Sequence, residues 1–174
     1  GIGKIVDKLK KIGELENTII MFAADNGGCA EFLAEDSNQP NTNQFNNPGP
    51  DGTKVNFGNI PNLRPGPADT FMSYDLPWAN LSNTPFRLFK RWVHEGGIST
   101  PFIVHWPEKI TNHDIINTPV QFADISPTIL DICGSDYPKT YKSNEITPLE
   151  GESFARLFDG YEFNKSNSLF WEHE

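Results

Sequence analysis

One apolar run with a polar turn behind it decides the expected fold, and it reads Ile19-Ile20-Met21-Phe22-Ala23-Ala24-Asp25-Asn26-Gly27-Gly28. Residues 18–24 carry no charge and include two β-branched isoleucines, which is typical of a strand covered on both faces in a parallel sheet. Ligands of such sheets bind beyond the carboxyl ends of the strands. Asp25 and Asn26 are therefore expected at a binding edge.

Asp25 and Asn26 offer oxygen atoms to a hard cation. A carboxylate and an amide oxygen suit Ca²⁺, with Mg²⁺ as the second choice, rather than zinc or copper. Gly27 and Gly28 allow the backbone to turn close to a bound group. The alternative is that these four residues form only a turn, because Asp-Gly and Asn-Gly are strong turn formers.

Composition sets the class of protein. The chain has 174 residues, of which 37% are hydrophobic and 12% aromatic, enough for one domain with a core. A formal net charge of −9 argues against a dedicated nucleic-acid binder, which must neutralise phosphates. No stretch approaches 18 apolar residues, so no membrane span is predicted. The sequence does not indicate an oligomeric state.

The pattern of elements predicts an α/β fold, with a mostly parallel central sheet flanked by helices. An amphipathic helix over residues 2–12 should end at Gly13 and lead into the strand. Residues 35–69 are rich in Asn, Pro, Gly and Asp and are predicted to form a long loop excursion, either a specificity element or a tolerated insertion. Because the chain opens inside a helical pattern and closes on a strand-like run at 168–174, we expect residues 1–174 to be one partial domain, truncated at both ends.

A second polar and aromatic cluster precedes a second strand, which is expected over residues 101–106. Arg87, Lys90 and Arg91 fall within five positions and would share a face in a helical turn, forming an anion pocket. The alternative is that they are solvated surface charges. Paired glycines at 96–97 predict a tight backbone path.

The last third of the chain is predicted to be scaffold. Ser126 should cap a helix that ends at Gly134 and turns Cys133 into the core, and a shorter helix is expected over residues 153–158. Asp124 is expected to serve helix-end electrostatics rather than catalysis.

Five motifs follow one another along nearly the whole chain: Asp25-Asn26-Gly27-Gly28; Ser82-Asn83-Thr84-Pro85-Phe86-Arg87-Leu88-Phe89-Lys90; His94-Glu95-Gly96-Gly97-Ile98-Ser99-Thr100-Pro101; Phe122-Ala123-Asp124-Ile125-Ser126-Pro127-Thr128-Ile129-Leu130; Leu169-Phe170-Trp171-Glu172-His173. This ordered set resembles the middle-to-late portion of a type I sulfatase, in the arylsulfatase family of the alkaline phosphatase-like superfamily. Each motif is weak alone, but the ordered set is specific.

The resemblance implies roles for three residues. Sulfatases of this kind bind a divalent cation, usually calcium, and the later pair of its ligands corresponds to Asp25 and Asn26. A lysine that contacts the sulfate group corresponds to Lys90. Arg87 is a candidate helper to which no catalytic role is assigned, and His94 is expected to be structural.

The departures from the family pattern concern the nucleophile. Family members use a formylglycine made from Cys or Ser in a Cys/Ser-x-Pro/Ala-x-Arg motif, and neither Cys29 nor Cys133 begins one. Residues 99–103 come nearest but end in Ile rather than Arg. Two oxygen ligands are also too few for calcium, which takes six to eight, so this stretch alone is expected to bind metal poorly and to be inactive.

By resemblance, the predicted function is a sulfuric ester hydrolase that acts on a sulfated carbohydrate or a small aryl or alkyl sulfate ester. The family habit is a periplasmic, secreted or lysosomal location. Two alternatives remain: a phosphoester or phosphonate hydrolase of the same superfamily, and a non-catalytic relic that binds anions or carbohydrate.

Overall fold

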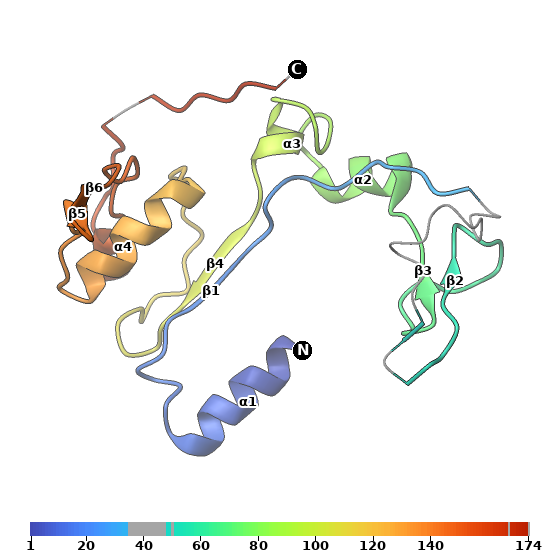
Figure 1. Cartoon of the computed structure of the whole chain (residues 1–174), viewed down its shortest axis with the longest axis horizontal. Helices are drawn as coiled ribbons and strands as arrows, with labels where there is room; N and C mark the ends of the chain where they lie inside the picture. The colour runs from blue at the N-terminus through green and yellow to red at the C-terminus, as the bar shows by residue number, and fades with distance from the viewer. Residues whose placement is uncertain (35–47, 50, 167, 174) are drawn as a thin grey trace. The chain divides into compact units, whose positions relative to one another are not determined.

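The computed structural model describes residues 1–34, 48–49, 51–166 and 168–173. Short helices and short strands are mixed along the described chain, as expected of the α/β class (Figure 1). In chain order they are α1 (Ile2–Ile12), β1 (Ile20–Ala23), β2 (Asn56–Phe57), β3 (Thr70–Phe71), α2 (Asp75–Asn83), α3 (Glu95–Ile98), β4 (Phe102–His105), η1 (Phe122–Asp124), α4 (Ile125–Ile132), β5 (Thr140–Tyr141), β6 (Asn144–Glu145) and η2 (Ala155–Asp159), where η marks a 3₁₀ helix.

The strands pair two by two. β1 pairs with β4, β2 with β3 in parallel, and β5 with β6 in antiparallel register. β1 and β4 lie side by side in Figure 1, and they are the two strands that the apolar runs of the sequence predict. Within the described residues no sheet has more than two strands, so the mostly parallel central sheet stays a prediction.

The chain divides into two compact units. One contains residues 1–21 and 103–170, and the other contains residues 22–102 and 171–174. The loops that carry Asp25, Asn26 and Lys90 all belong to the second unit. Whether residues 1–174 form one partial domain stays a prediction.

The first helix confirms the sequence prediction. α1 ends at Gly13, which adopts the left-handed conformation with φ 77° and directs its N–H to the carbonyls of Leu9 and Lys10. That cap is available because glycine has no Cβ to clash at positive φ. Ile2 and Ile5 on the apolar face remain 54% and 61% exposed in the described chain.

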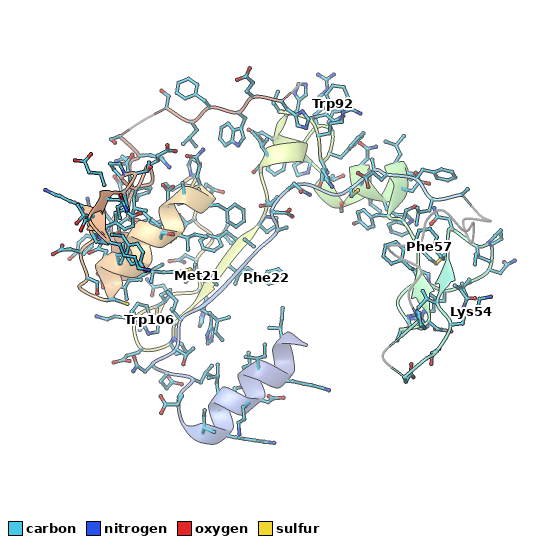
Figure 2. All side chains as sticks on the ribbon, viewed as in Figure 1. Met21, Phe22, Lys54, Phe57, Trp92 and Trp106 are labelled. Carbon is cyan, nitrogen blue, oxygen red and sulfur yellow. The ribbon has the colours of Figure 1, made fainter. Side chains whose placement is uncertain are left out.

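The strand before Asp25 forms, but its predicted burial on both faces is wrong for the described chain. β1 covers Ile20–Ala23, and Phe22 in its middle is 51% exposed (Figure 2). Within the described residues β1 has one neighbouring strand, β4. A neighbouring strand pairs with the backbone along the edge of β1 and does not cover the side chains on either face.

The predicted start and inner face of the fourth helix also need correction. α4 begins at Ile125 rather than after Ser126, because it continues directly from the 3₁₀ helix η1. A capping box between Gln121 and Asp124 satisfies the first backbone N–H groups of η1. Cys133, predicted to be a core thiol, is exposed. Thr128 is instead the buried residue of α4.

A buried ion pair organises this first unit. The Asp124 side chain is fully buried, and its two carboxylate oxygens accept from the Lys165 ammonium at 2.7 and 2.6 Å. The backbone N–H groups of Gln121 and Glu152 donate to the same carboxylate at 2.8 and 2.9 Å. Asp124 therefore has the structural role at a helix end that the sequence predicts. It also forms an ion pair with Lys165, which lies far from it in the sequence.

Burial by itself would raise the pKa of Asp124, because the charged form loses water. The hydrogen bonds from Lys165, Gln121 and Glu152 favour the charged form and leave the pKa below its ordinary value. Thr128 extends the network, since its hydroxyl donates to the Asp124 carbonyl at 2.6 Å and accepts from the Phe154 N–H at 3.0 Å. Phe154 is 1% exposed and packs edge-on against Phe158 with ring centroids 5.8 Å apart.

Three further predictions concern loops and ends. The 35–69 excursion contains the strand β2, which pairs with β3. Phe57 of β2 (Figure 2) is 1% exposed and stacks on Phe71 with ring centroids 5.0 Å apart. The prediction for residues 35–47 and 50 lies outside the described residues. The expected strand at 168–174 is wrong over 168–173, which form no strand. The helix predicted over 153–158 is the 3₁₀ helix η2, closed by Gly160 at φ 77°.

None of the described helices is both long and apolar enough to cross a membrane.

Replacing Asp124 with Asn should lower the free energy of unfolding by about 3–5 kcal/mol at pH 7, because Lys165 is left buried without its counter-charge. The folded-state pKa is depressed, so the contribution is fully present above the ordinary Asp pKa of about 3.9 and is lost as the pH falls through the lower folded value. Denaturant unfolding of the full-length protein between pH 7 and pH 2.5 measures both effects.

Asp131→Asn is the matched control, because the exposed Asp131 carboxylate accepts from the Ser153 hydroxyl and pairs with no lysine in the described part of the chain. It should cost less than about 1 kcal/mol. Equal losses for the two variants would contradict the assigned role of the buried pair.

Candidate functional site

The site begins directly after β1, where Asp25 is exposed and Asn26 is half-buried. The Asn26 amide nitrogen donates to the Gly27 carbonyl at 2.8 Å, which leaves the amide oxygen as the atom available to a cation. Among the described residues, none donates a hydrogen bond to the Asp25 carboxylate or to the Asn26 amide oxygen. Both oxygens are thus available for coordination.

The glycines of this loop pack backbone against backbone. The Gly27 N–H donates to the Gly97 carbonyl at 2.9 Å. A Cβ on Gly27 would lie 1.7 Å from the Gly96 carbonyl oxygen, and a Cβ on Gly96 would lie 2.0 Å from the Leu88 oxygen. The tight backbone path predicted for residues 96–97 is confirmed, and it lies against both the loop that carries Asp25 and the backbone of residues 87–92.

The loop of Lys90 joins the same arrangement. The Lys90 N–H donates to the Gly28 carbonyl at 3.1 Å, although the two residues are far apart in the sequence. The Lys90 side chain is 44% exposed, and its ammonium lies 3.9 Å from the Glu31 carboxylate. The structure thus brings the backbone of Lys90 to the loop of Asp25 and Asn26, while the contact between Lys90 and sulfate stays a prediction.

Asn83, the last residue of α2, links these two loops and has no role in the sequence prediction. Its side-chain oxygen accepts from the Gly28 N–H at 3.0 Å, and its side-chain nitrogen donates to the Leu88 carbonyl at 3.0 Å. Gly28 lies 55 positions away, so no local pattern in the sequence could have indicated the contact.

The predicted helical turn through the cation cluster is wrong. Leu88 and Arg91 have φ values of 66° and 92°, which a right-handed helix does not allow. Arg87 takes part through its backbone, since its carbonyl accepts from the Gly96 N–H at 2.9 Å. The His94 carbonyl accepts from the Gly97 N–H at 2.7 Å at the start of α3 (Glu95–Ile98). The structural role expected for the His94 side chain stays a prediction.

The donor set fits part of a calcium shell. Across the residues that the structure describes, no group of three or more His, Cys, Asp or Glu side chains gathers to hold a metal ion. Asp25 and Asn26 supply hard oxygen ligands of the right kind, and calcium takes six to eight. Their chemistry therefore fits the cation, and their number requires further ligands.

Comparisons with known proteins agree with the motifs. The family model described as Sulfatase matches residues 1–135, which is more than half of the chain. The chain therefore belongs to the sulfatase family.

Named relatives support the same membership. An uncharacterized sulfatase of Schizosaccharomyces pombe is 34% identical over 140 residues, which cover 79% of this chain and 23% of that protein. An arylsulfatase of Klebsiella aerogenes is 29% identical over 159 residues, covering 90% of this chain and 31% of that protein. A steryl-sulfatase of Mus musculus is 22% identical over 151 residues, covering 86% and 18%. The alignments thus span less than a third of the length of each relative.

Gly27→Ala should lower the free energy of unfolding by about 3 kcal/mol, because the added methyl group meets a backbone oxygen that no side-chain rotation can move away. Thermal and denaturant unfolding of the full-length protein measure the loss.

Gly3→Ala is the control for the same chemical change, since nothing lies within 4 Å of a Cβ at that helical position. It should be neutral or stabilise by up to about 1 kcal/mol. If both alanine variants unfold like the parent protein, the close approach of the two glycine loops is wrong.

Proposed function

We propose that the full-length protein is a sulfuric ester hydrolase in which Asp25 and Asn26 bind a divalent cation, most favourably Ca²⁺, and Lys90 contacts the sulfate group. The observation that supports this most directly is the 3.1 Å hydrogen bond from the Lys90 N–H to the Gly28 carbonyl. Two oxygen ligands and a cationic side chain thereby come from loops that touch. Membership of the sulfatase family supports the same assignment.

The proposal includes the alkaline phosphatase-like fold, with a mostly parallel central sheet. β1 and β4 are two paired strands that would belong to it. Asp25 lies two residues after β1, at the carboxyl end of the strand, where α/β proteins bind their ligands.

The chemistry requires charge to be neutralised on a tetrahedral anion. Lys90 would bind a sulfuryl oxygen and orient the ester, and it would offset negative charge as the ester oxygen leaves. A bound cation would supply the same kind of electrostatic stabilisation from the side of Asp25 and Asn26. The formylglycine nucleophile is assigned to residues outside these 174, because no motif for it lies among them.

We propose sulfate esters as the substrates, rather than phosphoesters or phosphonates, because the relatives named above are sulfatases. The substrate class is a sulfated carbohydrate or a small aryl or alkyl sulfate. A non-catalytic relic that binds anions or carbohydrate is the alternative from another class, and it predicts calcium binding without turnover of either ester.

Lys90→Ala should reduce kcat/KM for an aryl sulfate by about 10²–10³-fold, because one charge that stabilises the transition state is removed. Lys54→Ala is the control, since Lys54 (Figure 2) is an exposed lysine of the same compact unit. Steady-state kinetics of the full-length variants, together with their thermal unfolding, give the answer. Unchanged turnover by a folded Lys90→Ala protein would remove the assigned contact.

Chelation should abolish turnover of the full-length protein, and added Ca²⁺ should restore it. Asp25→Ala should raise the calcium concentration at half-maximal activity by more than about tenfold, because a charged ligand is lost. Asp7→Ala, at an exposed position of α1, should leave that concentration unchanged. Turnover that persists after exhaustive chelation would overturn the metal-dependent mechanism.

A further inference from the structure

One side chain bonds both loops of the proposed site. Asn83 is half-buried at the end of α2, and both polar atoms of its amide bind backbone groups outside its own helix. Its oxygen accepts from Gly28 at 3.0 Å, and its nitrogen donates to Leu88 at 3.0 Å. Leu88 lies two residues before Lys90, so a single planar group reaches the metal-binding loop and the lysine loop.

The contact with Gly28 continues to a proposed metal ligand. The N–H that donates to the Asn83 side-chain oxygen is the Gly28 N–H, which belongs to the peptide unit between Gly27 and Gly28. The carbonyl of that same peptide unit, on Gly27, accepts from the Asn26 side-chain nitrogen at 2.8 Å. Because a peptide unit is planar and rigid, fixing its N–H also fixes the direction of its carbonyl. Asn83 thus fixes the orientation of the Gly27 carbonyl, and the hydrogen bond to this carbonyl orients the Asn26 side-chain amide.

The opposite side of Gly28 is fixed as well. Its carbonyl accepts from the Lys90 N–H at 3.1 Å. The Lys90 loop is therefore held to Gly28 directly and, through the Leu88 carbonyl, to Asn83.

We propose that Asn83 is a positioning residue that orients the Asn26 amide oxygen toward the cation and holds the Lys90 loop beside it. This inference rests on the proposed function, because it assumes that Asn26 is a metal ligand. An amide is required at position 83, since the site needs one acceptor and one donor on a single planar group. Aspartate keeps the acceptor and loses the donor, and alanine loses both.

The test measures calcium affinity by chelator competition, without substrate, on the full-length protein. Asn83→Ala should weaken calcium binding about tenfold, the lower end of the range for residues that orient a metal ligand. Asn80→Ala is the matched control: it lies in the same helix, and its side chain donates at 3.0 Å to Leu76 within that helix. The control should leave calcium affinity unchanged.

A double-mutant cycle separates positioning from general loosening of the fold. Asn26→Ala should weaken calcium binding by itself, and adding Asn83→Ala should then have little further effect, because the amide to be oriented is gone. Additive losses would overturn the inference while leaving the metal site in place. If Asn26→Ala leaves calcium affinity unchanged, the proposed metal site fails, and the inference fails with it.

Asn83→Asp provides a second variant of nearly the same shape, for use if the alanine variant does not fold. Its carboxylate still accepts from Gly28, so calcium binding should not weaken. It cannot donate to the neutral Leu88 carbonyl, so kcat/KM should fall by up to about tenfold through the Lys90 loop, the upper end of the loss expected for one neutral hydrogen bond. Calcium binding that weakens as much as in Asn83→Ala would contradict the proposed division of roles.

Discussion

Backbone contact between glycines is the constraint on which the candidate site depends. Gly27 and Gly96 approach so closely that a Cβ on Gly27 would lie 1.7 Å from the Gly96 oxygen. The Gly27 N–H uses this proximity to donate to Gly97 at 2.9 Å. Any larger residue would separate the two loops, and the hydrogen bonds that join them would lengthen beyond their useful range.

With the loops in contact, backbone and amide groups fix the geometry more firmly than charges do. Asn83 and the Lys90 N–H satisfy both polar groups of Gly28. The ion pair between Lys90 and Glu31 is 3.9 Å long, with side chains 44% and 81% exposed, and pairs of this kind contribute little to stability. The Lys90 backbone is therefore held in place while its ammonium group remains available to an anion.

The first unit uses a different arrangement, because its buried carboxylate carries a charge. Asp124 is fully buried and is satisfied by the Lys165 ammonium and two backbone N–H groups. A buried charge is tolerated only when such partners surround it. The pair fixes the C-terminal part of this unit against η1, and it does so far along the chain from the loops that carry the proposed chemistry.

The sequence by itself determined the local features: α1 with its left-handed Gly13, the strands that became β1 and β4, and the tight path of residues 96–97. Each follows from periodicity or from glycine, which act within a few residues. Tertiary structure alone decided that Asn83 joins Gly28 and that positive φ at Leu88 replaces a helical turn. The first outcome depends on a backbone 55 positions away, and no local propensity carries information about so distant a partner.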